Sequence, residues 1–213
     1  MSSTLASPDA PARRVRFDAS ERVVHWLTAV VALGLIATGA VMYLGPLATL
    51  VGYRGVVRVV HFWCGVAVPV PVVLGLLAPR RGRALRADAR ELERFDARDR
   101  AWLRRRNRAT VGAGKFNAGQ KLNSALLLGS GAVLFATGLM LHFAVHVPVD
   151  LRTGATFVHD WFALGVALLV TGHIAFALRD PGALGGMLTG SVTETWARRH
   201  HPRWAGPPPP PPR

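Results

Sequence analysis

The sequence contains a single cysteine, Cys64, among 213 residues. One thiol cannot form a disulfide within the chain or supply the ligands of an iron–sulfur cluster, so both kinds of site are excluded within this chain. Acidic residues are scarce as well: 12 Asp and Glu stand against 26 Lys and Arg, which gives a formal net charge of +14. Long polar stretches are few, because half of the residues are hydrophobic. We therefore expect one membrane domain and no separate soluble domain.

Four apolar windows are long enough to cross a bilayer, at about residues 23–44, 56–78, 122–146 and 155–178. They predict an all-α membrane protein, a four-transmembrane-helix bundle over residues 23–178. Residues 1–22 form an N-terminal segment, and residues 179–213 form a C-terminal tail with a polyproline end, Pro207–Pro212. Pro69 and Pro71 predict a kink near the middle of the second span. No internal repeat is evident.

The long connection, residues 79–121, admits two interpretations. Four apolar side chains fall roughly on one helical face, namely Leu85, Leu92, Phe95 and Trp102. That pattern is typical of an amphipathic helix lying on the membrane surface. A solvated charged loop with incidental apolar residues explains the composition equally well.

Basic residues are distributed unevenly around the four windows. Twenty-three of the 26 Lys and Arg lie before the first window, in the long connection or after the fourth window, whereas Arg54, Arg58 and Arg152 lie on the opposite side. The positive-inside rule therefore predicts a multi-pass protein with both termini and the long connection in the cytoplasm. Because these arginines flank membrane spans, membrane lipid is the expected polyanionic partner, and no nucleic acid is expected.

Histidines within the windows fall at matched depths. His159 and His173 are 14 residues apart in the fourth window, which corresponds to about 21 Å along a helix and to nearly the same face. A first helix entering from the cytoplasm places His25 near the inner surface, and the returning second helix places His61 near the outer surface. Depth thus pairs His25 with His173 and His61 with His159. Two stacked bis-histidine haem sites, each clamped between two helices, are the leading interpretation.

Other interpretations of the histidines stay open. His142 and His146 are one helical turn apart near the outer end of the third window, and either could replace His61 or His159. A single zinc site would need its ligands at one depth, which this division does not provide. Isolated membrane histidines can also be hydrogen-bonded core residues, so a non-redox membrane anchor is an alternative. His200 and His201 lie in the polar tail and are expected to face solvent.

A polar loop precedes the third span at the inner membrane edge. The side-chain amides of Asn117 and Gln120, together with the backbone of Gly119, could donate hydrogen bonds to a quinone carbonyl. In the alternative interpretation Asn117 caps the third helix, while Lys115 and Lys121 contact lipid headgroups. Both interpretations remain open from the residues alone.

Several motifs together resemble one known family, the cytochrome b (gamma) subunit of respiratory formate dehydrogenase. They are Glu21-Arg22-x-x-His25-Trp26, His61, the block Gly114-Lys-Phe-Asn-x-Gly-Gln-Lys121, and His159 followed by His173. The resemblance covers about residues 16–200, and the block at residues 114–121 is its most specific part. The Arg-rich connection and the polyproline end depart from the family pattern. The histidine pattern alone is also similar to the haem b subunits of membrane nickel–iron hydrogenases, which are the first alternative.

The resemblance implies a three-subunit complex in the bacterial inner membrane. A catalytic alpha subunit with a molybdenum or tungsten pterin would oxidise formate, and an iron–sulfur beta subunit would pass electrons to this chain. Two haems b would carry them inward, with His61 and His159 as axial iron ligands of the outer haem and His25 and His173 as those of the inner haem. Ubiquinone or menaquinone would be reduced near Asn117, Gly119 and Gln120. Formate chemistry itself would lie outside this chain.

Overall fold

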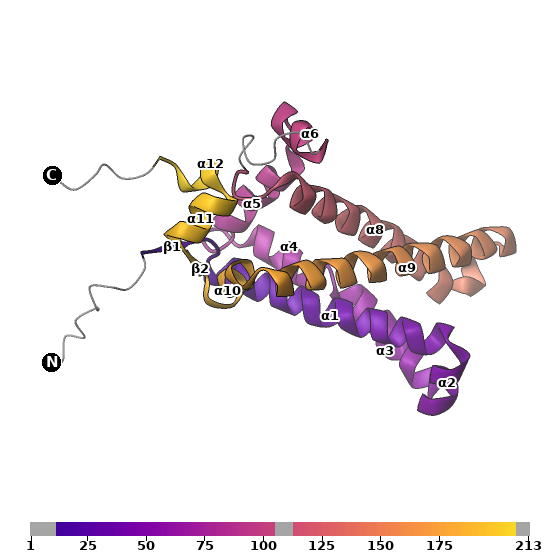
Figure 1. Cartoon of the computed structure of the whole chain (residues 1–213). Coiled ribbons are helices and arrows are strands. Elements are labelled where there is room, and N and C mark those ends of the chain that lie inside the picture. The colour runs from indigo at the N-terminus through magenta and orange to yellow at the C-terminus, as the bar shows by residue number, and fades with distance from the viewer. Residues whose placement is uncertain (1–11, 105–112, 208–213) are drawn as a thin grey trace, which may run out of the picture.

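The computed structural model describes residues 12–104 and 113–207, and this part of the chain is helical apart from one short two-stranded sheet (Figure 1). Four long apolar stretches can each cross a membrane, so the protein is a multi-pass membrane protein. They are α1 (Ala19–Tyr43), the consecutive helices α3 (Arg54–Ala67) and α4 (Val70–Leu77), α8 (Ala118–His142) and α9 (Val149–Arg179). The predicted all-α, four-span fold is confirmed.

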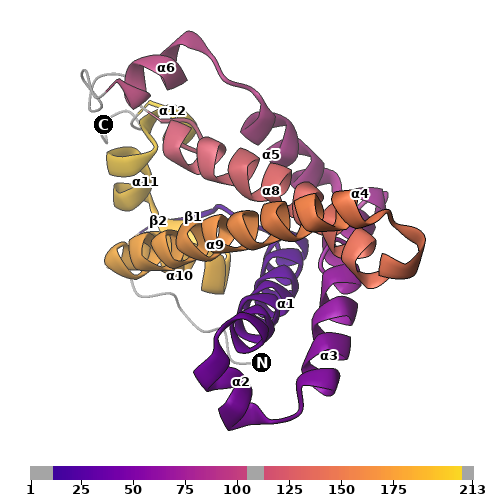
Figure 2. The ribbon, with the colours of Figure 1, turned by 90° about the vertical axis from the view of Figure 1, so that its right-hand side faces the viewer.

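The spans form two helix pairs. The helix α1 lies beside α3, and α9 lies beside α8, as the view turned by 90° also shows (Figure 2). Packing within the spans is loose, since at most 6 % of the residues in any apolar window are buried inside the protein. The bundle therefore has no tightly packed apolar centre of its own.

Both α1 and α8 begin at a capping box. At α1, the Asp18 carboxylate accepts the N–H of Glu21 (2.8 Å), and the Glu21 carboxylate accepts the N–H of Asp18 (2.6 Å). Asn117 and Gln120 make the same reciprocal pair at α8, with both distances 2.9 Å. These bonds satisfy N–H groups that have no partner within the helix. The helices therefore begin about four residues before the apolar windows.

The second span is broken where proline predicted a kink. Helix α3 ends at Ala67 and α4 begins at Val70, and Pro69 lies between them. Proline lacks an N–H and clashes with the preceding turn, which interrupts the helical hydrogen bonds. The third span shows a different departure, because α8 ends at His142 and His146 belongs to a separate 3-10 helix, η1 (Ala144–His146). The expectation that His142 and His146 share one helical face was wrong.

Elements outside the spans gather mainly at one end of the molecule (Figure 1). The long connection contains two helices, which favours the helical interpretation over a simple solvated loop. The polar tail is folded as well. The elements at this end are β1 (Arg13–Val15), α5 (Arg83–Glu93), α6 (Ala97–Leu103), α10 (Pro181–Thr189), β2 (Ser191–Thr193), α11 (Glu194–His200) and α12 (Pro202–Ala205), whereas α2 (Gly45–Val51) lies at the opposite end. The predicted polyproline conformation falls beyond Pro207, outside the described residues.

The segment 191–206, here called the C-terminal cap, is tied to the start of the chain. Strands β1 and β2 pair antiparallel, with Arg14 opposite Val192. His201 is only 3 % exposed, and its Nδ1 lies 2.7 Å from the carbonyl oxygen of Gly114. Nδ1 must therefore carry the hydrogen, and Nε2 accepts a bond from Arg16 at 3.1 Å. The expectation that His201 faces solvent was wrong, because it bridges two parts of the inner end.

The bridging histidine predicts a pH dependence of the C-terminal cap. Burial, together with the charge of Arg16, lowers the pKa of His201 from 6.5 to about 4. The unfolded cap thus binds a proton at a higher pH than the folded cap, so we expect the cap to lose stability as pH falls from about 6.5 to about 4. Limited proteolysis of the C-terminal segment should accelerate over that range.

Substitution provides the matched control. His201→Ala should weaken the cap by about 1–3 kcal/mol at neutral pH, because the Gly114 carbonyl and the Arg16 guanidinium both lose a buried partner. Thr195→Ala, at an exposed position of α11, should leave the cleavage rate unchanged. Equal cleavage rates in the two variants would contradict the bridging role.

Candidate functional site

Two pairs of histidines meet between the spans. The ring centroids of His25 on α1 and His173 on α9 are 6.2 Å apart. Those of His61 on α3 and His159 on α9 are 6.3 Å apart. The structure therefore brings together the same pairs that depth matching predicts, and each pair joins two different helices. We refer to His61 and His159 as the outer pair and to His25 and His173 as the inner pair.

Each histidine of the outer pair contacts a threonine hydroxyl. Thr38 Oγ1 lies 2.8 Å from His61 Nδ1 and donates its own hydrogen to the Gly34 carbonyl at 2.7 Å. A hydroxyl has one hydrogen, so toward His61 it acts as the acceptor of an Nδ1–H bond. The Nε2 atom of His61 is then the unprotonated nitrogen, with a lone pair available to a metal.

The second threonine repeats this arrangement on the other side. Thr137 Oγ1 donates to the Val133 carbonyl at 2.8 Å and lies 2.9 Å from His159 Nδ1. A glycine follows each threonine and lies against the ring, since a Cβ at Gly39 or Gly138 would come within 3.5 or 3.4 Å of the histidine Cε1. Both outer rings are thus held in the same tautomer, edge-on against a helix backbone.

These contacts reveal an internal repeat that the sequence analysis missed. Three short segments of the first two spans recur in the last two spans. The segment around Thr38 and the segment that caps α1 recur 99 residues later, and the dipeptide that contains His61 recurs 98 residues later. The matched segments are Ala37-Thr38-Gly39 with Ala136-Thr137-Gly138, Phe17-Asp18-Ala19 with Phe116-Asn117-Ala118, and Val60-His61 with Val158-His159. The repeated Ala-Thr-Gly tripeptide was the signal that could have identified both threonines.

The two copies of the repeat are related by an approximate two-fold axis, which the inner pair does not obey. Equivalent residues touch at two places, the outer pair and the rings of Phe17 and Phe116, whose centroids are 6.3 Å apart. A pseudo-two-fold axis must pass between the members of each touching pair. The inner pair has no such counterpart, because the positions equivalent to His25 and His173 are Ser124 and Gly75.

The two other outer histidines are placed differently. His142 stacks face to face on Phe62, with centroids 3.5 Å apart and an interplanar angle of 12°. His146 lies in η1, beyond the end of α8. The ring partner of His61 is His159 and not His142. The geometry therefore favours His61 and His159 as the outer pair over either alternative.

The polar loop before α8 combines both interpretations of its residues. The side-chain oxygens of Asn117 and Gln120 are used in the capping box, which confirms that Asn117 caps the third helix. Lys115 and Lys121 are held by nearly buried carboxylates, so the expectation that they contact lipid headgroups was wrong. Their amide nitrogens are not used by the cap and remain able to donate. At Gly119 an added Cβ would lie 3.3 Å from the ring of Trp102 on α6. The quinone role of Asn117, Gly119 and Gln120 stays a prediction.

A nearly buried ionic cluster, the Lys115 triad, lies one helical turn from the inner pair. Lys115 Nζ donates to Glu21 Oε1 at 3.1 Å and to both oxygens of Asp88 at 2.6 and 2.7 Å. Glu21 precedes His25 by four residues on the same face of α1. Burial and a hydrogen bond with Glu21 raise the pKa of Asp88 to about 8, although Lys115 opposes the shift. One ammonium thus neutralises one carboxylate, and Asp88 holds a proton at neutral pH.

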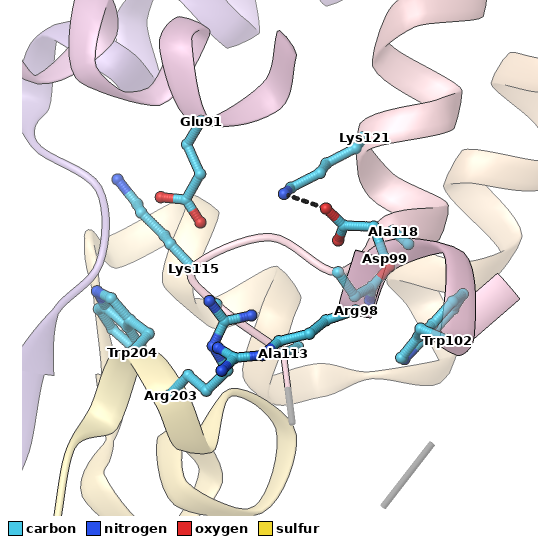
Figure 3. A pocket seen from close by; sticks show the side chains of 12 residues that line it. Glu91, Arg98, Asp99, Trp102, Ala113, Lys115, Ala118, Lys121, Arg203 and Trp204 are labelled. Atoms are coloured by element: carbon cyan, nitrogen blue, oxygen red, sulfur yellow. Dashed lines mark hydrogen bonds and ion pairs between the residues drawn. The ribbon is translucent and has the colours of Figure 1, made fainter. Parts of the chain in front are cut away.

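A charged cavity of about 330 Å³ borders the same loop. Lys115 and Asn117 both line it, and Lys121, held by Asp99 at 2.9 Å, closes one side (Figure 3). Large side chains around it also come from α5, α6 and α12, namely Glu91, Arg98, Trp102, Arg203 and Trp204. Lys115 of the triad and the polar loop therefore border one polar space at the inner end of the bundle.

Comparison with known proteins adds the family. Residues 16–190 match the model of the prokaryotic cytochrome b561 family. This chain belongs to that family. The matched range includes the four spans and both histidine pairs. Members are cytochromes of the b type, so this b561-family chain is a haem-binding membrane subunit.

Individual relatives extend the likeness over most of the b561-family chain. The formate dehydrogenase cytochrome b556(fdo) subunit of Escherichia coli strain K12 is 26 % identical over 206 residues, covering 89 % of this chain and 90 % of the relative. The cytochrome b556(Fdn) subunit of the nitrate-inducible formate dehydrogenase of the same strain is 26 % identical, with 89 % of each chain covered. The formate dehydrogenase cytochrome b556 subunit of Haemophilus influenzae is 25 % identical, covering 90 % of this chain and 82 % of the relative.

The histidine pairs of this b561-family chain fit haem iron. Two metal–imidazole bonds of about 2.0 Å, with each ring nitrogen about 1.1 Å from its centroid, would separate two ring centroids by about 6.2 Å. The observed separations are 6.2 and 6.3 Å. Nothing lies within 4 Å of a Cβ built at Gly165 or Gly172 of α9, so these two positions are open. Among the described residues no three His, Cys, Asp or Glu side chains gather as a metal cluster, so the geometry is that of paired ligands.

Haem content tests the outer pair. If the outer pair holds a haem, we expect His61→Ala to lower the haem-to-protein ratio of the purified chain by one site, because an iron bound there would lose one of its two imidazoles. His142→Ala removes a ring that stacks on Phe62 and should leave the ratio unchanged. The reverse result, with haem lost in His142→Ala and retained in His61→Ala, would assign the outer ligand to α8.

Proposed function

We propose that this chain is the membrane-anchoring, di-haem cytochrome b subunit of a formate dehydrogenase complex. Electrons from a periplasmic-side iron–sulfur subunit would enter at an outer haem held by His61 and His159. They would continue to an inner haem held by His25 and His173, and then to quinone near the cytoplasmic face. One observation carries the proposal. Two histidine pairs lie at different depths between the spans, with nearly the same separation of ring centroids in each pair, in a chain that is similar to formate dehydrogenase subunits over nearly nine tenths of its length.

The chain's own part in electron transfer is to hold two redox centres at fixed depths. Bound haem supplies reversible one-electron chemistry at iron. A single continuous helix, α9, contributes His159 to the outer pair and His173 to the inner pair. Fourteen residues of helix set these ligands about 21 Å apart along its axis. The separation of the two centres is therefore built into one rigid element and does not depend on a loop.

Orientation in the membrane follows from the charge distribution. β1, α5, α6 and the C-terminal cap lie at one end of the molecule (Figure 1). His25 lies in the first two turns of α1 and His173 in the last two turns of α9, so the inner pair belongs to this end. The described parts of the three segments that hold 23 of the 26 Lys and Arg lie there as well. Positive residues are retained on the cytoplasmic side of bacterial membranes. We therefore place both termini and the inner pair at the cytoplasmic face, with the outer pair toward the periplasm.

Residues at the inner end can supply what quinone reduction needs. The amides of Asn117 and Gln120 can donate hydrogen bonds to a quinone carbonyl, whether the quinone is ubiquinone or menaquinone. Reduction of a quinone to a quinol takes two electrons and two protons. The Asp88 carboxyl O–H in the Lys115 triad can release one proton toward the site, and the carboxylate left behind can be reprotonated by water from the cytoplasmic side.

Partner subunits would provide the formate chemistry. With one cysteine, this chain cannot itself hold an iron–sulfur cluster. The relatives are named as cytochrome subunits of formate dehydrogenases, which supports an iron–sulfur beta subunit and, through it, a molybdenum- or tungsten-containing alpha subunit as partners. Membrane lipid would surround the four spans.

Purification of the intact complex tests the proposed function. We expect the chain to copurify with an iron–sulfur subunit and a pterin-containing subunit, to carry two haems b, and to show haem reduction by formate and reoxidation by quinone. Copurification with a nickel–iron subunit and reduction by hydrogen would instead assign the chain to a hydrogenase. If the complex shows no b-type haem spectrum, the chain is a non-redox membrane anchor and the proposed function is wrong.

The proton-holding role of Asp88 gives a separate prediction. Because the pKa of Asp88 is raised to about 8, its proton is available below that pH and lost above it. Formate-driven quinone reduction should therefore fall as pH rises through about 8. In Asp88→Asn the rate should be lower by about tenfold or more, and this pH step should disappear.

Two controls separate this role from a structural one. Glu93→Gln changes an exposed carboxyl on the same helix, α5, and should keep both the rate and the pH profile. Haem content and haem reduction by formate should be normal in both variants. A wild-type pH step that persists in Asp88→Asn would show that another group delivers the proton.

A further inference from the structure

The two histidine pairs differ in what their second ring nitrogen contacts. Thr38 and Thr137 accept hydrogen bonds from the Nδ1–H groups of the outer pair, at 2.8 and 2.9 Å, and the backbone carbonyls of Leu35 and Leu134 are further acceptors for the same histidines. For the inner pair, the described parts of the chain provide only ring contacts, between His25 and His173 and between His25 and Trp26. The inner imidazoles thus have no protein hydrogen-bond acceptor within residues 12–104 and 113–207.

The hydrogen bonds of the outer pair cannot reverse direction. Each threonine hydroxyl already donates to the carbonyl four residues earlier in its helix, Gly34 for Thr38 and Val133 for Thr137. With its only hydrogen used, the hydroxyl can act only as an acceptor toward the imidazole. The same arrangement occurs twice, at equivalent positions of the internal repeat. Two independent instances of one geometry argue against an incidental contact.

A hydrogen bond from Nδ1–H changes the metal-binding nitrogen across the ring. It draws the N–H hydrogen toward the acceptor, which raises the basicity of Nε2 as a ligand. A more basic ligand stabilises ferric iron relative to ferrous iron and so lowers the reduction potential of the haem. The effect applies to both axial ligands of the outer haem and to neither ligand of the inner haem.

The charge distribution acts in the same direction. The inner pair lies at the end of the molecule that holds most of the Lys and Arg, whereas the outer end holds Arg54, Arg58 and Arg152. An added electron is stabilised by nearby positive charge, although solvent and salt screen the effect. Basic residues at the inner end therefore raise the potential of the inner haem, while threonine hydrogen bonds lower that of the outer haem.

We propose that Thr38 and Thr137 are positioning residues that set the reduction potential of the outer haem below that of the inner haem. Electron transfer from the outer to the inner site is then energetically downhill, which gives the chain its direction. This inference rests on the proposed function, because it requires both haems. It adds residues and a driving force that neither the family nor the histidine pairing supplies.

A redox titration of the intact complex tests this role. Haem absorption should resolve two components, and the component missing in His61→Ala identifies the outer haem. In the double variant Thr38→Val/Thr137→Val, which keeps side-chain shape but removes both hydroxyls, the outer component should shift to higher potential. The reduction potential of the inner component should not change and serves as an internal reference. The difference between the two potentials should therefore become smaller.

Two further variants control for packing and for loss of a threonine in general. Thr38→Ser/Thr137→Ser keeps the hydroxyls and should restore the outer potential. Thr153→Val removes an exposed threonine of α9 whose hydroxyl bonds only the Val149 carbonyl, and it should shift neither component. The low-spin electron paramagnetic resonance signal of the outer haem should change in the Val double variant alone, because its imidazoles lose their fixed orientation.

The outcomes distinguish failure of the inference from failure of the proposed function. Two haems whose potentials are the same in wild type and in the Val double variant would overturn the role of the threonines. An equal shift of both components would also overturn it, since the effect would not be local to the outer pair. A complex with a single haem would instead refute the proposed di-haem function on which the inference rests.

Discussion

The rigidity of one helix is the constraint on which the arrangement of both histidine pairs depends. Helix α9 runs unbroken from Val149 to Arg179 and carries His159 and His173 on nearly one face. Its partners come from the opposite helix pair, with His61 on α3 and His25 on α1. Because an α-helix has a fixed rise, the two sites can neither approach nor separate without breaking hydrogen bonds in α9.

Loose packing of the spans is a consequence of the same design. A bundle that packed its apolar side chains tightly would leave no room between opposed imidazoles for a macrocycle. Here the two helix pairs meet through the paired histidines, through the stack of His142 on Phe62 and through the inner-end contacts around Phe17 and Phe116, and few residues within the spans are buried. Ionic and hydrogen-bonded contacts at the inner end therefore contribute much of the specificity that a packed core would otherwise provide. The Lys115 triad, the pair of Lys121 with Asp99 and the His201 bridge connect four segments distant in sequence.

The internal repeat explains why the outer and inner sites are not alike. At the outer end the approximate two-fold axis passes between the paired histidines, so both rings have equivalent surroundings, each with its threonine and glycine. At the inner end the axis passes between Phe17 and Phe116 instead. The inner pair lies off the axis, and its equivalent positions, Ser124 and Gly75, lack ligands. A Cβ at Gly75 would lie 2.7 Å from Leu85 of α5 and from Val24, so close packing occupies that position. Departure from symmetry leaves the inner end with one histidine pair and a separate polar loop.

Hydropathy and helical periodicity predicted much of this protein from the sequence. Runs of about 20 apolar residues have few folded solutions other than a membrane helix, so the four spans, the proline kink and the depths of His25, His61, His159 and His173 followed from local pattern. Local pattern did not predict that the tail folds, that His201 is buried or that α8 ends at His142, because these depend on residues far apart in the chain. Arg16, Gly114 and His201, for example, meet only once the helices are assembled.

Hydropathy and helical spacing along the chain thus predict the number of spans and the heights at which histidines can meet, because the geometry of a single helix sets these quantities. Tertiary structure alone decided which atoms meet at those heights. It placed Thr38 and Thr137 against the outer imidazoles, left the inner imidazoles without such acceptors, and gathered Glu21, Asp88 and Lys115 from three segments into one buried triad. Hydrogen bonds act over about 3 Å, so the packing of separate helices, and not the spacing along any one of them, selects the partners.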